Sequence, residues 1–234
     1  MKYVLYLPLL FLFSCSGNDA SKFLHSGIEK YKNKDYKGSI EDLTLSLEEK
    51  PDFDSAYFHR ATANRLFGNN KAALDDLNNT IKYNPNYAEA YNNRGLLRAG
   101  SDNPEREIDD FSKAIELKPA YKSAWFNRGN AYLDRGKYFD AVNDYNQAIS
   151  IDTNYDRAYF NRGNAKDGLN DSEGALADYR KCVELNFLND GETYYLMGLD
   201  KIELQDKEGG CVELKKAQEA GYSGAASKIR QYCK

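Results

Sequence analysis

A period of 34 residues constrains the possible folds of this chain more than any other feature of its sequence. One aromatic column recurs at that step in five successive segments and contains Phe23, Tyr57, Tyr91, Trp125 and Tyr159. A column of small residues follows four positions later and contains Gly27, Ala61, Gly95, Gly129 and Gly163. Such a period is typical of small structural units that stack, because each unit buries its apolar face against a neighbour.

Within one frame, the pattern predicts a helix, a turn and a second helix. In residues 122–155, related residues recur at three- and four-residue spacing from Ala124 to Tyr132, Gly136 interrupts the pattern, and it resumes at Ala141. Three frames end at a proline, where a helix is expected to stop, namely Pro51, Pro85 and Pro119. Because no strand pattern competes, we expect an all-α fold.

Trp125, Gly129, Tyr132, Ala141 and Tyr145 together resemble the signature of the tetratricopeptide repeat. The fourth frame departs from that signature at Thr153, where a proline is usual. Four frames have an arginine at the usual leucine position, and these are Arg60, Arg94, Arg128 and Arg162. The resemblance implies a right-handed α-solenoid of about six helix-turn-helix units with a C-terminal capping helix.

The repeat register divides the chain. Residues 20–189 are predicted to form five repeats, with the bounds 20–53, 54–87, 88–121, 122–155 and 156–189. Past Asn189 the phase slips by one residue. Residues 190–234 are therefore predicted to contain a degenerate sixth repeat, followed by a capping helix from Gly224 to Lys234.

The N-terminus resembles the signal peptide of a bacterial lipoprotein. An apolar run from Tyr3 to Phe13 is too short to span a bilayer comfortably, and it precedes Cys15. In such proteins the cysteine becomes the lipidated first residue. We expect a signal in residues 1–14, lipidation of Cys15, a short tether in residues 15–19, and a membrane-anchored lipoprotein of the bacterial envelope, at the outer membrane. An ordinary cleaved signal and an uncleaved anchor are the alternatives.

Three further cysteines lie within the repeat region. Cys182 shares a column with Ala114 and Ala148, which predicts a buried and unreactive thiol. Cys211 and Cys233 lie at equal distances on either side of the turn before the capping helix, so two antiparallel helices would bring them together. In an exported protein this arrangement favours a disulfide, and two unlinked core cysteines are the alternative.

Aspartates accompany the repeated arginines in a column of their own, which contains Asp42, Asp76, Asp110, Asp144 and Asp178. Each arginine and aspartate of a frame lie equally far from the turn between the helices. An ion pair within the hairpin and an ion pair to the next repeat are both compatible with this spacing. We expect a ladder of charged hydrogen bonds that stabilises the stack, with anion binding as the alternative.

Asparagines form two columns on one face of the first helix. The first column contains Asn93, Asn127 and Asn161, with His59 in the second frame, and the other contains Asn130 and Asn164. Phenylalanines precede the first column at positions 58, 126 and 160, and Phe58, Phe126 and Phe160 would add apolar contacts. The family resemblance implies that this face lines a concave groove that binds a protein or peptide partner.

Two observations weigh against this groove as a binding site. Duplicated repeats share asparagines whether or not they bind anything. In addition, the set of lysines and arginines that forms a carboxylate clamp elsewhere in the family is not visible, and phenylalanine and asparagine occupy the clamp-like positions.

Charge and motifs argue against other classes of function. The formal net charge of -4 argues against nucleic-acid binding. His25 and His59 occupy matching columns, and the chain contains no metal-binding or phosphate-loop motif. We therefore expect a non-catalytic interaction scaffold or adaptor without cofactor or metal. A structural or glycan-handling envelope lipoprotein is the alternative, because the 19 tyrosines could stack on sugar rings.

Overall fold

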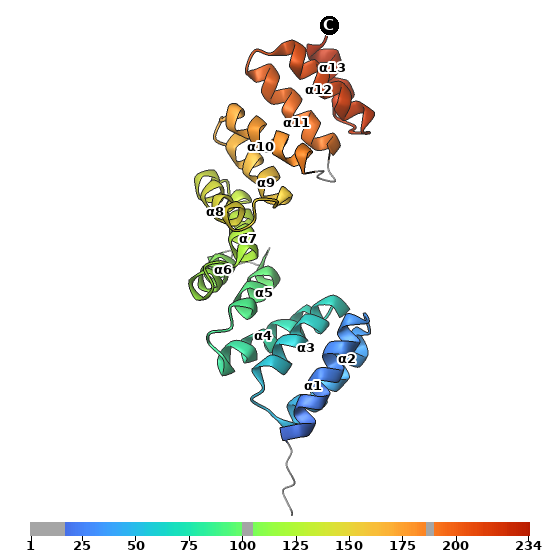
Figure 1. Cartoon of the computed structure of the whole chain (residues 1–234), viewed down its shortest axis with the longest axis vertical. Coiled ribbons are helices and arrows are strands. Elements are labelled where there is room, and N and C mark those ends of the chain that lie inside the picture. Colours follow the sequence, from blue (N-terminus) through green and yellow to red (C-terminus); the bar gives the residue numbers. More distant parts are fainter. Residues whose placement is uncertain (1–16, 100–104, 186–189) are drawn as a thin grey trace, which may run out of the picture. The chain divides into compact units, whose positions relative to one another are not determined.

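The computed structural model describes residues 17–99, 105–185 and 190–234, and over these residues it consists of α-helices without a β-strand (Figure 1). The helices are α1 (Gly17–Lys32), α2 (Tyr36–Glu49), α3 (Asp54–Phe67), α4 (Asn70–Tyr83), α5 (Ala88–Arg98), α6 (Glu105–Leu117), α7 (Lys122–Leu133), α8 (Tyr138–Ile151), α9 (Asp156–Asp167), α10 (Ser172–Glu184), α11 (Asp190–Glu203), α12 (Lys207–Glu219) and α13 (Ala225–Tyr232). The fold is all-α and belongs to the solenoid class, because consecutive helices form hairpins that pack on their sequence neighbours.

The helix starts follow the period of the sequence. The first helices of four successive hairpins begin at Asp54, Ala88, Lys122 and Asp156, which are 34 residues apart. The residue contacts divide the chain into two compact units, residues 1–90 and 91–234. The first unit contains the hairpins α1–α2 and α3–α4, and the second contains those from α7–α8 onward together with α13.

Small and large side chains face each other inside each hairpin. A Cβ atom at Gly129 would lie 2.7 Å from Cε1 of Tyr145, and a Cβ atom at Gly163 would lie 2.6 Å from Cε1 of Tyr179. Both tyrosines are fully buried. The small-residue column therefore exists because a large ring from the second helix lies directly against the first helix.

The turn inside a hairpin places one residue in the left-handed region of backbone conformation. These residues are Lys34 (φ 63°), Gly68 (φ 92°), Gly136 (φ 67°), Asn170 (φ 59°) and Gln205 (φ 67°). The first four lie at multiples of 34 residues, and Gln205 lies one residue later, as the phase slip predicts. Glycine suits this position best because it has no Cβ atom to clash.

The helices at the two ends of the described chain differ slightly in their bounds from the segments expected there. Helix α1 begins at Gly17, so part of the segment expected to be a tether, residues 17–19, is helical. Asp19 lies in the first turn, where a carboxylate is favourable, and it pairs with Lys22 at 3.1 Å. At the other end, α13 is the expected capping helix. Residues 1–16, with the predicted signal and Cys15, lie outside the described residues.

No helix within the described ranges combines the length and the apolar character needed to cross a membrane.

Candidate functional site

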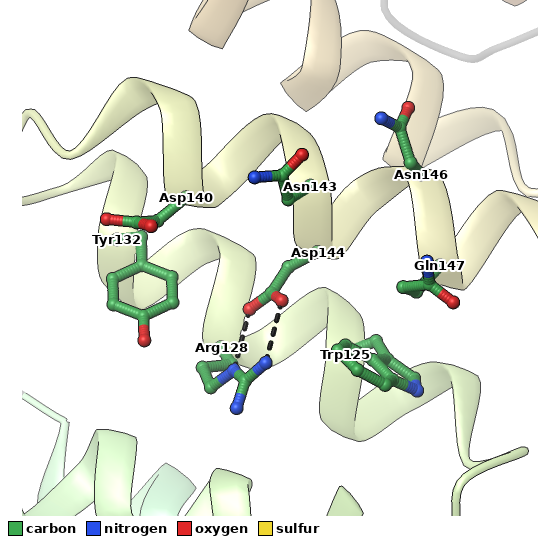
Figure 2. A pocket seen from close by; sticks show the side chains of 8 residues that line it. All are labelled: Trp125, Arg128, Tyr132, Asp140, Asn143, Asp144, Asn146 and Gln147. Atoms are coloured by element: carbon green, nitrogen blue, oxygen red, sulfur yellow. Dashed lines mark hydrogen bonds and ion pairs between the residues drawn. The ribbon is translucent and has the colours of Figure 1, made fainter.

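The repeated arginines bind aspartates of their own hairpin. Arg128 donates from Nε to Asp144 Oδ2 at 2.7 Å and from Nη2 to Oδ1 at 2.8 Å (Figure 2). The same two-bond contact joins Arg60 to Asp76 at 3.0 and 2.7 Å. The spacing of the sequence allowed pairs within or between repeats, and these pairs lie within them.

A third bond from the arginine reaches the preceding hairpin. Nη1 of Arg60 donates to Thr44 Oγ1 at 3.1 Å, and Nη1 of Arg128 donates to Ser112 Oγ at 2.9 Å. Arg162 makes the equivalent bond to Asn146 Oδ1 at 2.6 Å. The guanidinium groups of Arg60, Arg128 and Arg162 therefore each hold a hairpin closed and also tie it to the preceding one.

Five of the hairpins have a further donor to the carboxylate, which the sequence pattern did not predict. It lies twelve residues before the acid, and the pairs are Lys30–Asp42, Asn64–Asp76, Arg98–Asp110, Lys166–Asp178 and Lys201–Glu213. Asp144 has Tyr132 at this position instead. The residue type changes from frame to frame, so the column does not stand out in the sequence. The five side chains have in common only a nitrogen atom that can donate a hydrogen bond.

The cleft in Figure 2 belongs to this ladder. It has a volume of about 380 Å³, and its floor is made of Trp125, Arg128 and Asp144. The Trp125 Nε1 atom donates to the Pro119 carbonyl at 2.8 Å, and the Arg128 guanidinium lies 5.0 Å from the Trp125 ring centroid. These groups already bind one another, which makes the cleft the outer surface of a structural network.

The asparagine columns form a second network, which connects successive first helices. Asn127 Nδ2 donates to Asn92 Oδ1 at 2.9 Å, linking α7 to α5. Asn161 Nδ2 donates to Asn130 Oδ1 at 2.7 Å, linking α9 to α7. Asn161 and Asn130 therefore join the two predicted columns across repeats, whereas Asn127 binds Asn92, which belongs to neither column.

Buried tyrosine hydroxyls fix the second asparagine column. The Tyr145 hydroxyl donates to Asn130 Oδ1 at 2.8 Å, and the Tyr179 hydroxyl oxygen lies 2.7 Å from Asn164 Oδ1. Burial raises the pKa of both tyrosines above the ordinary value. The hydroxyls therefore stay protonated and keep the asparagine side chains in one orientation.

A cleft opens beside two of the predicted residues. It has a volume of about 160 Å³ and is bordered by Asn127, Asn130, Leu96, Ala99 and Asp134, among others. Leu96 is 42% exposed, and Asp134 is exposed. Polar amides thus border an accessible apolar surface on the face formed by the first helices.

The three predicted phenylalanines pack against aromatic rings of the protein itself. The Phe58 ring stacks on Tyr87 with centroids 4.7 Å apart, and the Phe126 ring lies 4.9 Å from that of Tyr155. Phe160 is only 8% exposed and packs in a core cluster with Tyr179. Its ring faces the interior, which argues against contact with a partner, and the role of Phe160 in binding stays a prediction.

His59 and Asn93 are not among the residues that line this cleft. His59 is half-buried beside the Phe58 ring, and burial lowers the pKa of its imidazole. Asn93 Oδ1 accepts a bond from Asn92 Nδ2 at 3.4 Å. The structure therefore brings Asn127 and Asn130 to a cleft, and the other predicted residues are not among those that line it.

The cysteines follow the sequence pattern. Cys211 and Cys233 form a disulfide with an S–S distance of 2.01 Å, which joins α12 to the residue after α13. Cys182 is buried, and burial raises the pKa of its thiol to about 12. At neutral pH this thiol is therefore protonated and unreactive.

Stacked helix hairpins that share hydrogen bonds define an all-α repeat protein. Family models described as TPR repeat or Tetratricopeptide repeat match residues 66–122, 111–143, 129–166 and 156–187. The chain therefore contains tetratricopeptide repeats. A model described as Anaphase-promoting complex subunit 5 matches residues 23–89. A search of curated proteins gave no match.

Solved structures share this fold. A structure titled as the functional characterization of Pseudomonas aeruginosa pilF has a TM-score of 0.78 at 13% identity, over 92% of this chain and 98% of that one. PilW, described as a type IV pilus biogenesis factor, has a TM-score of 0.73 at 17% identity, over 90% and 97%. MamA protein has a TM-score of 0.65 at 24% identity, over 72% and 92%.

Proposed function

We propose that this protein is a non-catalytic scaffold or adaptor that binds a segment of a partner protein on the face formed by its first helices. The observation that carries the proposal is the cleft where Asn127 and Asn130 border the apolar side chains of Leu96 and Ala99. Amides can hold the backbone of a peptide while an apolar surface receives one of its side chains. The tetratricopeptide repeats support the same role.

The amides are held in place before any partner binds. Asn130 accepts hydrogen bonds from both Tyr145 and Asn161, and Asn127 donates to Asn92. A fixed side chain loses little conformational entropy when it binds. The network that stabilises the stack therefore also preorganises the proposed binding surface.

Photo-crosslinking from single positions tests this proposal. A photoreactive residue at Leu96 or Asp134 reports on the cleft, and one at Asn143 is the control, because this exposed residue lies in the cleft of Figure 2. In native membranes, Leu96 and Asp134 should yield the same crosslinked protein, identified by mass spectrometry, and Asn143 should not. Capture from Asn143 alone would place the binding surface on the other face.

The proposed location is the bacterial envelope, with a lipid on Cys15 as the anchor. The support is the apolar run from Tyr3 to Phe13 directly before this cysteine. Labelled fatty acid should be incorporated into the wild type, and Cys15→Ala should release the protein from membranes. Unchanged membrane association of Cys15→Ala would reject the anchor.

The aromatic residues support the glycan-handling alternative less well than they support the binding of a protein segment. Tyr145 and Tyr179 are fully buried, and the Trp125 ring is covered by Arg128. Sugar stacking needs an open ring face. A pull-down with envelope polysaccharide would reveal this activity, and we expect no binding above that of a repeat protein of similar charge.

A further inference from the structure

A cluster of carboxyl groups lies where the fifth hairpin meets the sixth. Asp167 is the last residue of α9, and Asp200 and Glu203 lie in the last turn of α11. Asp200 is 5% exposed, and its Oδ2 atom is buried, as is Oδ1 of Asp167. Neither of these two atoms has a hydrogen-bond donor among the described residues.

The carboxyl groups of Asp167 and Asp200 lie close enough for each to shift the pKa of the other. Two ionised carboxylates that share a buried site repel each other, so one of them keeps a proton. Burial, followed by the negative charge of Asp167, raises the pKa of Asp200 to about 8, and burial also raises the pKa of Asp167. At neutral pH the pair holds one proton.

Among the described residues, no lysine or arginine forms an ion pair with Asp167 or Asp200. The Tyr179 hydroxyl from α10 donates to Asp167 Oδ2 at 2.6 Å, and the charges of Glu203 and Asp171 add to the negative potential at Asp167. The lysines on these helices are bound elsewhere: Lys166 pairs with Asp178 at 2.8 Å and Lys201 with Glu213 at 2.6 Å. The cluster is therefore an uncompensated acidic site.

The site is continuous with the proposed binding face. The Tyr179 hydroxyl that contacts Asp167 also contacts Asn164, a member of the second asparagine column. Glu203 and Asp171 are exposed and Asp167 is half-buried, so solvent reaches the cluster from the side of Asp167 and Glu203, with Asp200 behind them. A ligand extended along the asparagine columns would reach the acids at their C-terminal end.

We infer that Asp167, Asp200 and Glu203 receive a lysine or arginine side chain of the protein partner. This inference rests on the proposed function and adds a specificity to it, namely a basic residue in the bound segment. A metal ion fits less well, because no group of His, Cys, Asp or Glu among the described residues has a metal-binding arrangement. An ammonium or guanidinium group supplies the donors that Asp167 Oδ1 and Asp200 Oδ2 lack.

Binding would release a proton. The cation takes the place of the proton between Asp167 and Asp200, the proton goes to solvent, and the positive charge of the side chain compensates the carboxylate that is formed. Affinity should therefore increase with pH, by up to about tenfold per unit between pH 6 and pH 7.5, and level off above pH 8.

Carbon-detected NMR of the aspartate carboxyl groups tests the site with a defined probe. Acetyl-Gly-Arg-Gly-amide at millimolar concentration should shift the Asp167 and Asp200 signals, and the citrulline analogue, which is neutral and of similar shape, should not. Asp200→Asn should abolish the increase of affinity with pH, and Glu203→Gln should weaken binding at least about threefold, as expected for loss of one exposed carboxylate. Asp109→Asn, an exposed acid of α6, is the matched control and should leave binding unchanged.

Several results would overturn the inference. They are equal binding of the arginine and citrulline peptides, a pH dependence that persists in Asp200→Asn, and saturable shifts produced by Mg²⁺ or Ca²⁺ alone. Circular dichroism shows whether each variant folds, and Glu203→Gln keeps the test valid if Asp200→Asn does not. Crosslinking from Leu96 and Asp134 together with no response to the arginine peptide would reject this site and leave the proposed function in place.

Discussion

Gly129 lies against the buried ring of Tyr145, so closely that a Cβ atom at position 129 would be 2.7 Å from Cε1 of the tyrosine. Gly129→Ala should therefore lower the free energy of unfolding by about 1 to 3 kcal/mol, because the tyrosine must move in a close-packed core. Urea unfolding measures the change. The second frame has Ala61 in this column and Leu77 opposite, so Gly129→Ala combined with Tyr145→Leu should recover part of the loss. No recovery would contradict the steric explanation.

Removal of Arg128 should leave the Asp144 carboxylate buried without its main partner. Asp144 is 3% exposed, and Arg128→Met should cost about 3 kcal/mol of stability. Arg128→Met combined with Asp144→Asn should cost less than the sum of the two single changes, because the second change removes the unpaired charge. Additive losses in chemical denaturation would argue against a direct pair.

The acid pair predicts that the protein becomes less stable as pH rises. Asp200 has a pKa of about 8 in the folded chain, and an unfolded aspartate has a pKa of about 3.9. The folded state therefore holds an extra proton between these values. The associated stability is fully present below about pH 4 and is lost as pH rises through 8.

Urea unfolding at pH 5, 7 and 9 checks this dependence. The wild type should lose on the order of 1 to 3 kcal/mol across the range. Asp200→Asn has no proton to lose at this position, so its stability should change less with pH. The same decline in both proteins would exclude Asp200 as its source.

The disulfide between Cys211 and Cys233 should form in exported protein. The intact mass without reductant should then be about 2 Da lower than after reduction, from the loss of two hydrogens. The bridge spans 22 residues, and loops of this size contribute about 3 kcal/mol. Reduction should accordingly lower the unfolding midpoint of the wild type and leave that of Cys211→Ser with Cys233→Ser unchanged.

Lys34 adopts a left-handed conformation with φ 63°. A lysine pays a steric penalty there that glycine avoids, so Lys34→Gly should stabilise the protein by up to about 1 kcal/mol. Glu41→Gly is the control, since it lies on the exposed side of α2 and should destabilise by about 1 kcal/mol. Thermal unfolding distinguishes the two signs.

Periodicity predicted the helix pairs because a 34-residue repeat with small and large columns admits few other structures. It could not decide which aspartate each arginine binds, since Arg128 and Asp144 are equally far from their turn. The asparagine face was expected to be open. Its amides are instead partly engaged by Tyr145 and Tyr179, whose hydroxyls extend from the buried side of the hairpin.

The sequence pattern did not predict the acid pair of Asp167 and Asp200 either. The register past Asn189 aligns Lys166 with Lys201, so Asp167 and Asp200 occupy different columns and no column contains both. Phe160 illustrates a similar difficulty. It shares a column with Phe58 and Phe126, which are half-buried, but packing against α10 and α11 buries it almost completely.

The third bond made by Arg60, Arg128 and Arg162 has a consequence for how such a chain can change in length. A 34-residue unit such as residues 122–155 contributes Arg128 to the joint before it and Asn146 to the joint after it. A copied unit therefore contains both the arginine for the joint before it and the acceptor for the joint after it. The neighbouring units need no new partner. Tandem duplication or deletion of whole units can extend or shorten the array at little cost in stability, whereas insertion of a fraction of a unit would break two joints together.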